Sequence, residues 1–324
     1  MNTVQEIKAP IREELNTFES HFRESMKSDV PLLNKITHYI VKRKGKQMRP
    51  MFVFLSGKVF GAVRDESYTA ASLIELLHTA TLVHDDVVDD ANERRGYFSL
   101  NALWKNKIAV LVGDYLLSRG LLTSVENDQQ ELLRIVSRAV ERMSEGELLQ
   151  MEKARLLNLN EETYYRVIGH KTASLISACC EAGAYSTGAS DEERQKMRSF
   201  GESVGMAFQI KDDLFDYGDG MDTGKATGVD IQERKLTLPL IHTLAHSDKK
   251  TQRRLSRIIK KRNKDRKTVE EVIDTVRSNG GLDYAREQME AFKHQALEEL
   301  YSLPDNEARK ALEGLVTYTT ERSK

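Results

Sequence analysis

The chain has 324 residues, of which 40% are hydrophobic and 31% are charged, so a substantial core is expected and disorder is not. Its formal net charge of -1 gives no reason to expect a nucleic-acid binder. Neither an apolar run long enough to cross a bilayer nor a signal-peptide stretch at the N-terminus is expected. The adjacent pair Cys179 and Cys180 excludes a disulfide framework, and reduced thiols fit a cytoplasmic protein.

Proline and helix-capping residues predict the secondary structure. The 188 residues from Met51 to Leu238 contain no proline and are rich in Ala, Leu, Glu and Arg, which favours helix over sheet. Capping boxes are predicted at Ser190 with Glu193 and at Thr268 with Glu271, and Asn279 begins a helix stop. We expect ten to thirteen helices in one all-α domain spanning residues 1–324. The longest loop is expected at 217–234.

Two acidic clusters each follow an apolar helical run. The first is Asp85-Asp86-Val87-Val88-Asp89-Asp90, and the second, about 130 residues later, is Asp212-Asp213-Leu214-Phe215-Asp216. Aspartates four apart share a helix face, and like charges at that spacing destabilise a helix by about 0.2–0.5 kcal/mol per pair. The helix dipole also disfavours anions late in a helix. Because folding alone would not choose this pattern, the clusters predict a binding site for cations.

Oxygen ligands of this kind suit Mg²⁺, which shares its coordination sphere with water and phosphate. The competing interpretation is a di-iron carboxylate bundle, since Glu75 and His78 match Glu-x-x-His. That class needs two such motifs, and the sequence supplies one. Zinc signatures such as H-E-x-x-H are absent from the sequence. A magnesium-bridged diphosphate therefore fits the two clusters better.

A diphosphate site also needs fixed cations, and basic residues occur in compact groups around the acidic clusters. Lys46 and Arg49 stand just before a predicted helix, and Arg94-Arg95 follows the first cluster. Lys171-Thr172 opens an apolar helix, and Lys225 and Lys235 flank the loop after the second cluster. Arginine binds phosphate oxygens bidentately and lysine supplies a point charge.

These motifs together resemble the trans-isoprenyl (polyprenyl) diphosphate synthase family over nearly the whole chain, with a closer likeness to octaprenyl- and heptaprenyl-type synthases. The matching segments are GKQMRP, ELLHTATLVHDDVVDDANERRG, VLVGDYLLSR, GHKTASL, FQIKDDLFDY and GKATGVDIQERKLTLPLI. The resemblance implies an isoprenoid synthase-type helical bundle around a central apolar cavity. It also implies Mg²⁺-dependent, head-to-tail condensation of isopentenyl diphosphate with a geranyl, farnesyl or geranylgeranyl diphosphate.

The resemblance further implies a role for each matched residue. Three Mg²⁺ ions would be held by Asp85, Asp89 and Asp212, with support from Asp86, Asp213 and Asp216. The allylic diphosphate would be contacted by Arg94, Lys171, Lys225 and Lys235. The isopentenyl diphosphate pocket would be formed by Lys46, Arg49, His78 and Arg95. Polar groups near the cationic intermediate would be Thr172 and Gln209, with Gln150 as a weaker match.

Product length is predicted from the residues that precede the first cluster. Ala80 and Thr81 are small, whereas short-product relatives tend to carry aromatic residues there, and Leu77 lies deeper on the helix. Each helical turn adds about 5.4 Å, similar to one isoprene unit. Products longer than C15 should therefore fit. The resemblance to long-chain synthases implies a C30–C45 product, with a C20 product as the alternative. Three positions depart from the family pattern, namely Gln47, Phe98 and Arg234, and they affect loop shape.

Several other interpretations and partners follow from the sequence. A class I terpene cyclase would carry an Asn/Asp-Ser/Thr-Glu metal motif, which is not found in the sequence. A regulatory subunit of a two-component synthase would lose its Asp motifs, whereas a catalytic subunit that needs a partner remains open.

The family resemblance implies a homodimer and allows peripheral membrane contact. The basic stretch from Lys249 to Lys267 is interpreted as a surface helix with a solvated outer face.

Overall fold

The computed structural model describes residues 3–42, 45–94, 96–156, 160–218, 227–261 and 265–321, without the side chains of Arg94, Arg155 and Leu156. The predicted all-α class is confirmed, because the regular secondary structure of the described part of the chain is helical apart from a single β-hairpin with two residues in each strand. The first elements are α1 (Val4–Lys8), the 3₁₀ turn η1 (Ala9–Ile11), α2 (Arg12–Ser25), α3 (Pro31–Lys42), α4 (Met48–Phe60), α5 (Asp65–Val88), β1 (Glu93–Arg94) and β2 (Tyr97–Phe98).

The chain continues as α6 (Leu100–Glu126), α7 (Gln130–Leu156), α8 (Glu161–Ile168), the π-helical turn η2 (Gly169–Ala173), α9 (Ser174–Ser186), α10 (Asp191–Asp216) and α11 (Val229–Gln232). It ends with α12 (Leu238–His246), α13 (Lys249–Lys260), α14 (Arg266–Ser278), α15 (Gly281–Tyr301) and α16 (Glu307–Glu321). The described residues thus form sixteen α-helical segments, more than the ten to thirteen expected. Very short helices such as α1 and α11 account for part of the excess, because segments of four or five residues give little periodic signal.

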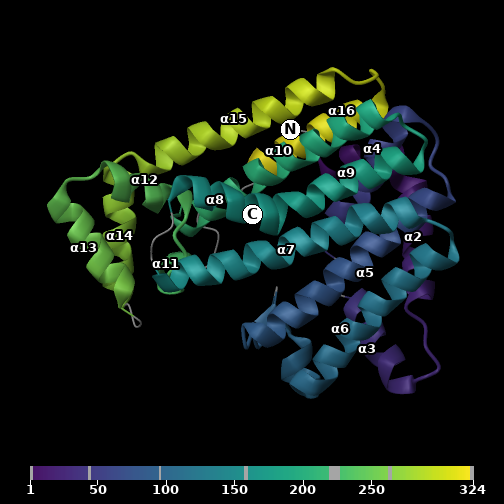
Figure 1. Cartoon of the computed structure of the whole chain (residues 1–324), viewed down its shortest axis with the longest axis horizontal. Helices are drawn as coiled ribbons and strands as arrows, with labels where there is room; N and C mark the ends of the chain where they lie inside the picture. Colours follow the sequence, from purple (N-terminus) through teal and green to yellow (C-terminus); the bar gives the residue numbers. More distant parts are fainter. Residues whose placement is uncertain are drawn as a thin grey trace.

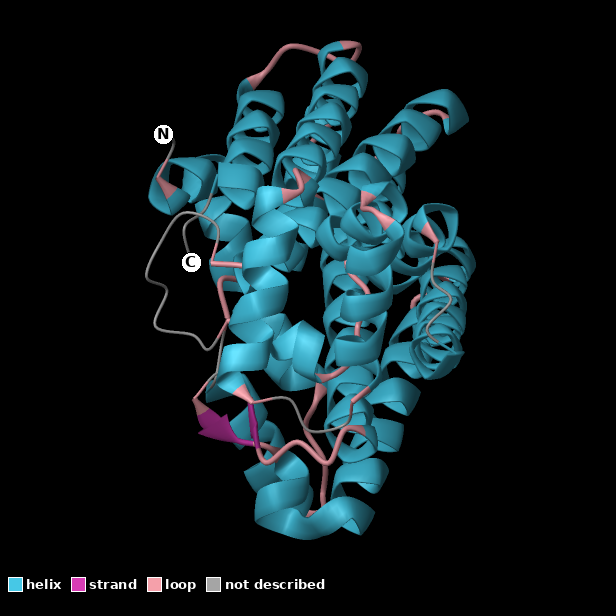
Figure 2. Ribbon diagram, turned by 90° about the vertical axis from the view of Figure 1, so that its left-hand side faces the viewer, coloured by secondary structure: helices cyan, strands magenta, loops and turns pink. Residues whose placement is uncertain are grey.

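The long helices form a bundle in which α9 and α10 are central. Helix α10 packs on α9 and α15, α9 also packs on α4 and α7, and α5 packs on α6. Figure 1 shows these long helices side by side, with α13 and α14 projecting as a hairpin at the left end. Figure 2 shows the β1–β2 hairpin at one end of the bundle.

Three clusters of buried apolar residues make up the core, and long helices connect them. Helix α10 supplies Phe200 to one cluster and Ile210 to the next, and α5 supplies Leu73 to one and Ala80 to another. A helix that contributes to two clusters ties their packing together. This sharing supports the prediction of a single domain.

The π-helical turn η2 is held between α7 and α10 by two glycines. A Cβ atom on Gly146 would lie 2.8 Å from both the Cβ of His170 and the backbone nitrogen of Lys171. One on Gly205 would lie 2.4 Å from the Cα of Ala173. Both distances are below van der Waals contact, so only glycine allows the two helices to approach the turn this closely. Since π turns often occur at functional sites, the position of η2 matters for the site.

The helix-end predictions are partly correct. The capping box at Ser190 and Glu193 is confirmed, and α14 ends just before Asn279. The N-cap prediction at Thr268 is wrong: α14 begins three residues earlier than that cap implies, and Asp265 accepts a hydrogen bond from the Thr268 N–H. Asp265 is the better cap because a carboxylate also interacts favourably with the positive end of the helix dipole.

Two further sequence expectations can be compared with the structure. Among the described helices, α6 alone is long and apolar enough to cross a membrane, as judged by length and composition only. No apolar run of this length was expected from the sequence. In the structure α6 packs against α5. Cys179 and Cys180 are unbridged, as predicted, and fully buried. Burial raises the pKa of Cys180 to about 12.

Candidate active site

The first Asp cluster lies where α5 ends. Asp85 and Asp86 occupy the last turn, and the N–H of Asp89, the C-cap residue, donates to the Asp85 carbonyl at 2.8 Å. The Asp86 side chain is 6% exposed, Asp85 is half-buried and Asp89 is exposed. Carboxylates at a helix C-terminus are disfavoured by the dipole. The cluster therefore places negative charge where a bound cation would relieve an existing cost.

The second Asp cluster lies in the last turn of α10 and is fixed by side chains from other segments. Tyr164 on α8 donates to Asp213 Oδ2 at 2.7 Å, and Gln209 donates to Asp213 Oδ1 at 2.9 Å. Thr172 in turn donates to Gln209 Oε1 at 2.7 Å. The predicted residues Thr172, Gln209 and Asp213 thus form one hydrogen-bonded chain that starts in η2 and ends at Tyr164.

Burial dominates the electrostatics of this network. It raises the pKa of Asp213 from 3.8 to about 7, against the stabilising bonds from Tyr164 and Gln209, and the charges of Asp230 and Asp212 raise it further. A carboxylate already tied to two donors and buried to 5% exposure has little freedom to reach a ligand. The geometry therefore favours a supporting role for Asp213, as the sequence predicted.

Asp216 holds the segment that follows the second cluster. Its carboxylate accepts hydrogen bonds from the backbone N–H groups of Val229 at 2.8 Å and Asp230 at 3.1 Å, at the start of α11. Burial, followed by the charge of Asp230, raises the pKa of Asp216 from 3.8 to about 6. This pairing brings α11, and Lys235 just beyond it, back to the end of α10.

Lys235 connects the two acidic clusters. Its ammonium lies 2.6 Å from Glu233 and 3.8 Å from Asp230. Burial disfavours its charged form, but Glu233, Asp230 and Asp89 together raise the pKa of Lys235 above its ordinary value. Because Asp89 belongs to α5 and Asp230 is held by Asp216, charges from both clusters act on one side chain.

Asp230 is a site residue that the sequence analysis did not single out. Burial raises the pKa of Asp230, Lys235 and Lys171 act in the opposite direction, and Asp212 adds to the rise. The ammonium of Lys171 lies 3.1 Å from Gln150 Oε1 and 2.5 Å from Glu147 Oε2, both on α7. The charges of Lys171, Asp212 and Lys235 therefore all act on the Asp230 carboxylate, as a common site requires.

The residues assigned to isopentenyl diphosphate lie along α4, α5 and the segment before α4. Arg49 makes a bidentate ion pair with Glu75, at 2.9 and 3.0 Å. The half-buried His78 lies one turn further along α5, on the face that leads to Asp85. Lys46 donates to the Tyr318 hydroxyl at 2.5 Å. Glu75 thus has an arginine as its partner, which weighs against the di-iron alternative.

Some predicted residues cannot be placed. Lys225 and Arg95 lie outside the described residues, as does the side chain of Arg94. Their proposed phosphate contacts stay predictions. The same holds for the ligand roles of Asp85, Asp89 and Asp212, which no contact in the structure tests.

The chain-length residues are packed in the core. Ala80 is 2% exposed in an apolar cluster with Met26 and Val41, while Leu77 packs against Gly120 on α6. Thr81 is half-buried, and its hydroxyl donates to the His78 carbonyl. The side chains around Ala80 are therefore apolar and closely packed, and the path for the growing tail stays a prediction.

The acidic side chains fit divalent cations. Within the described ranges, no three His, Cys, Asp or Glu side chains lie close enough together to hold a metal ion by themselves. Mg²⁺ in phosphate-transferring sites is commonly bound by one or two carboxylates, completed by substrate phosphate and water. The raised pKa values of Asp213 and Asp216 show carboxylates crowded together in a poorly solvated region. A cation bound nearby would stabilise their ionised forms.

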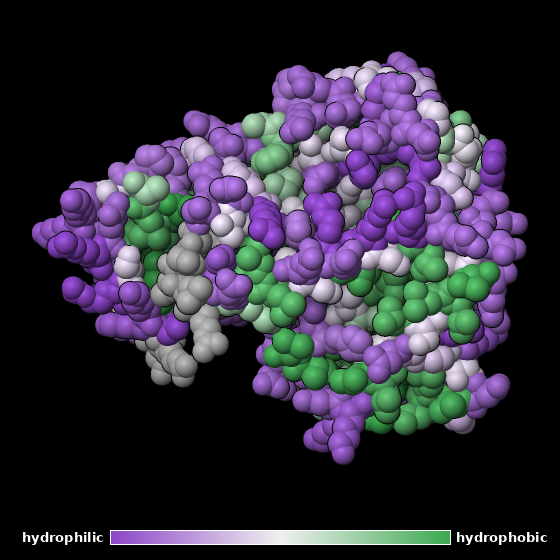
Figure 3. All heavy atoms as spheres, viewed as in Figure 1, coloured by the Kyte–Doolittle hydropathy of each residue, from purple (hydrophilic) through white to green (hydrophobic). Residues whose placement is uncertain are grey.

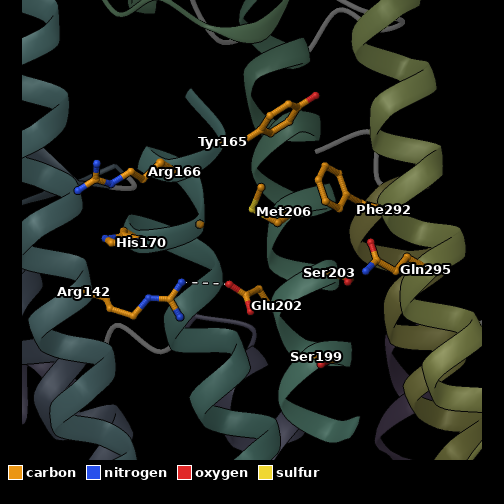
Figure 4. A pocket seen from close by; sticks show the side chains of 11 residues that line it. Arg142, Tyr165, Arg166, His170, Ser199, Glu202, Ser203, Met206, Phe292 and Gln295 are labelled. Atoms are coloured by element: carbon orange, nitrogen blue, oxygen red, sulfur yellow. Dashed lines mark hydrogen bonds and ion pairs between the residues drawn. The ribbon is translucent and has the colours of Figure 1, made fainter. Parts of the chain in front are cut away.

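A cavity of about 350 Å³ lies on the neighbouring side of η2. Figure 4 shows Arg142 paired with Glu202, and Tyr165, Met206 and Phe292 on the opposite part of its lining. The lining also includes His170, which directly precedes Lys171. The predicted site residues do not line this cavity, so the candidate site is the region between the Asp clusters.

Comparison with known proteins identifies the family of the chain. A polyprenyl synthetase family model matches residues 30–276. The chain is 37% identical over 302 residues to octaprenyl diphosphate synthase of Escherichia coli (strain K12), covering 93% of each chain.

Two solved structures are similar over the whole length. A decaprenyl diphosphate synthase from Rhodobacter capsulatus has a TM-score of 0.94 at 34% identity, covering 99% of this chain and 100% of that one. A polyprenyl synthase from Caulobacter crescentus CB15, complexed with calcium and isoprenyl diphosphate, has a TM-score of 0.91 at 32% identity, covering 100% and 99%. With this match in sequence and fold, the chain belongs to the polyprenyl synthetase family.

Proposed function

We propose that this chain is a trans-polyprenyl diphosphate synthase, a prenyltransferase that condenses isopentenyl diphosphate head-to-tail with an allylic diphosphate. Geranyl, farnesyl and geranylgeranyl diphosphate are the candidate allylic substrates. The observation that carries the proposal is the environment of Lys235, where Asp89 from α5 and Asp230, held by Asp216 of α10, act on one ammonium group. Such a site combines fixed cations with carboxylates on opposite sides, as a metal-bridged diphosphate needs.

The proposed cofactor is Mg²⁺, with three ions per site. The Caulobacter relative binds calcium together with isoprenyl diphosphate, which supports the use of divalent metal in this family. Asp85, Asp89 and Asp212 would hold the ions, and Asp86, Asp213 and Asp216 would support them. When bound, the ions would neutralise the diphosphate oxygens and make diphosphate a better leaving group.

The protein's own side chains would bind and orient the two substrates. Lys171 and Lys235, fixed by Gln150 and Glu233, would bind the allylic diphosphate and stabilise the charge that develops as its C–O bond breaks. Thr172 and Gln209 would place their oxygens near the allylic cation. Apolar side chains would exclude water, and the released diphosphate would accept the proton, so no dedicated side-chain base is needed.

We infer that the product is C30–C45, with C20 as the alternative. The growing tail would pass Ala80, whose apolar cluster includes Met26 and Val41. Met26 and Val41 also line a cavity of about 480 Å³ between the end of α2 and α3. The tail would find apolar contacts in the Ala80 cluster, whereas the other residues that line this cavity are polar, among them Arg23, Lys27 and Asp29. Ala80→Phe should shorten the product, and an unchanged product distribution by mass spectrometry would refute this tail path.

We further infer a homodimer formed through α6. This helix exposes Val110, Leu111, Leu122 and Val125, and Leu111 and Val125 are about 60% exposed. Figure 3 shows apolar residues gathered at the lower right, where Figure 1 places α5 and α6. An exposed apolar face of this extent is typical of a protein–protein contact. A cytoplasmic location stays a prediction, and a catalytic subunit that needs a second subunit stays the alternative.

The decisive experiment compares the purified wild-type chain with Asp85→Ala and Asp212→Ala. Incorporation of labelled isopentenyl diphosphate into a farnesyl diphosphate primer should fall at least about 1000-fold in both variants, because each loses a proposed metal ligand. The helical circular dichroism should not change. Asp274→Ala, which removes an exposed carboxylate on α14, serves as the matched control and should retain wild-type activity.

The same assay separates the rival functions. A terpene cyclase would consume the allylic diphosphate without isopentenyl diphosphate, and a catalytic subunit of a two-component synthase would be inactive alone. Near-normal activity of both Asp85→Ala and Asp212→Ala would contradict the proposed mechanism.

A further inference from the structure

Helix α13 carries an unusual concentration of positive charge. Its twelve residues, KKTQRRLSRIIK, include six basic residues and no acidic one. The basic residues are all exposed: Lys249, Lys250, Arg253, Arg254, Arg257 and Lys260. The whole chain, by contrast, is nearly neutral, with 49 basic and 50 acidic residues. The charge of α13 is therefore a local feature.

The six basic residues form one continuous face, here called the α13 basic face. At about 100° per residue, they fall within an arc of about 140°. Leu255, Ile258 and Ile259 lie on the opposite side and are buried. Figure 1 shows α13 at the outer edge of the projecting hairpin, and Figure 3 shows that end of the molecule covered by hydrophilic residues.

Helix stability does not explain this arrangement. Lys249 and Lys250 lie in the first turn, where the helix dipole disfavours cations. Lys249, Arg253 and Arg257 repel one another at four-residue spacing. Among the six, within the described part of the chain, only Arg254 has a side-chain ion pair, with Glu271 on α14 at 2.6 Å. The buried apolar side of α13 confirms the surface helix predicted from the sequence. The electrostatic repulsion among the basic residues is a separate feature, and an anionic partner would relieve it.

The α13–α14 hairpin is attached to the active site. Arg234, the neighbour of Lys235, donates to the carbonyl of Lys260 at 2.7 Å. Arg277 on α14 donates to the carbonyl of Tyr217, the residue after Asp216, at 3.4 Å. A partner bound to the α13 basic face would therefore lie beside the segments that follow the second Asp cluster.

The chemistry of the proposed product indicates which anionic partner the α13 basic face binds. Neither α13 nor α14 contains an aromatic residue, so the hairpin lacks the stacking surface that single-stranded nucleic acids use. A C30–C45 prenyl diphosphate is mostly hydrocarbon and partitions into a bilayer. A bilayer that contains acidic phospholipid would attract basic side chains and accept this product.

We propose that the α13 basic face docks the enzyme on membranes rich in anionic phospholipid, an inference that rests on the proposed long-chain synthase function. The contact is electrostatic and peripheral, because Leu255, Ile258 and Ile259 are committed to the protein core and cannot insert. Docking by this face keeps the segments around Lys235 close to the membrane surface.

Vesicle co-sedimentation tests the proposal on the full-length protein without substrate. The wild-type chain should bind phosphatidylcholine vesicles that contain phosphatidylglycerol, and should bind pure phosphatidylcholine vesicles weakly. Binding should be lost at about 1 M salt, where the Debye length is about 3 Å. Removing one basic residue near an anionic surface weakens binding about fivefold, so the triple variant Lys249→Glu, Arg253→Glu and Arg257→Glu should bind at least about 100-fold more weakly.

A control variant with the same change in net charge separates the basic face from overall charge. Arg12→Glu, Arg138→Glu and Lys310→Glu alter exposed residues on α2, α7 and α16, and this variant should bind vesicles nearly as well as wild type. Both triple variants should retain wild-type prenyl transfer in detergent solution with farnesyl diphosphate. Asp212→Ala, in contrast, should abolish transfer and leave vesicle binding intact, so failure of docking and failure of the proposed function are distinguishable.

Three results would overturn the docking proposal. One is wild-type protein that stays in solution with phosphatidylglycerol vesicles at low salt. Another is equal loss of binding in the two triple variants, which would assign the effect to net charge. The third is tighter binding of single-stranded RNA than of the anionic vesicles at the same salt concentration, which would make nucleic acid the better partner.

Discussion

The two Asp clusters share one sequence pattern but are fixed in different ways. The second, at the end of α10, is tied to α8, η2 and α11 by hydrogen bonds to Asp213 and Asp216. The first, at the end of α5, leads into exposed backbone with unusual conformations, with φ of 48° at Asp90 and 72° at Lys105. In the first cluster, a backbone hydrogen bond joins the Asp89 N–H to the Asp85 carbonyl.

This difference suggests two roles for the aspartates, namely positioning other residues of the site and binding cations. The buried, hydrogen-bonded carboxylates of the second cluster stabilise the site before any substrate arrives. Asp89 and Asp212, in contrast, are exposed to solvent. Substitutions in the two groups should therefore have different consequences for stability even where their effects on activity are similar.

The largest contrast is expected between Asp89→Ala and Asp216→Ala. Both should lower kcat at least about 100-fold, since one removes a proposed ligand and the other releases α11 and Lys235. Only Asp216→Ala should lower the free energy of unfolding, by about 1–3 kcal/mol, because it leaves the N–H groups of Val229 and Asp230 without their acceptor. Urea unfolding with EDTA measures this. An equal stability loss in Asp89→Ala would remove the distinction between the clusters.

Tyr164→Phe should test the buried network alone. The loss of one hydrogen bond to Asp213 should cost about 1–3 kcal/mol of unfolding free energy. It should also reduce kcat by about tenfold, because Gln209 and Thr172 lose their anchor. The neighbouring Tyr165→Phe, whose hydroxyl bonds Gln288 instead, is the matched control. Comparable kcat values for the two variants would show that the network does not position the site.

The buried carboxylates also predict how stability depends on pH. Asp213 has a pKa of about 7 in the folded protein against an ordinary 3.8, so between these values the folded state holds a proton that the unfolded chain has released. Stability without divalent cations should therefore fall as pH rises through this window, with Asp216 acting in the same direction up to about 6. Asp213→Asn should flatten the slope in urea unfolding at pH 5 to about 8. A slope equal to that of wild type would assign the effect to other groups.

The smallest predicted effect is on the stability contributed by α6, which packs on α5, the helix that leads to the first Asp cluster. Lys105 interrupts α6 with φ 72° and ψ 159°, a conformation that favours glycine. Lys105→Gly should raise the free energy of unfolding by about 1 kcal/mol by relieving this strain. Lys107→Gly, at an exposed position of the same helix, should lower it by about 1 kcal/mol. Destabilisation by both substitutions would show that position 105 is not strained.

Sequence patterns predicted the parts of the site that repeat at short range. Both clusters were expected late in their helices. The structure places Asp85 and Asp86 in the last turn of α5, with Asp89 as its C-cap, and the second cluster in the last turn of α10. Arg234, one of the three positions that depart from the family pattern, has φ of 63°. Glycine is favoured in this left-handed conformation, so the departure falls at a position of unusual backbone geometry.

Long-range partners were beyond the reach of sequence patterns. Tyr164 lies 49 residues from Asp213 and carries no periodic signal of its role. Asp230 becomes important only because Asp216 draws α11 back to α10. The cap of α14 was misassigned because Asp265 and Thr268 both offer a side-chain oxygen, and only the three-dimensional structure decides between them.

The central claim is that both clusters bind one metal–diphosphate unit, and calorimetry with farnesyl thiodiphosphate, an unreactive substrate analogue, tests it most directly. Wild-type protein should bind the analogue only with Mg²⁺, and Asp85→Ala or Asp212→Ala alone should each weaken this binding at least about tenfold. Full Mg²⁺-dependent affinity in either variant would contradict the account, because one cluster would then suffice without the other.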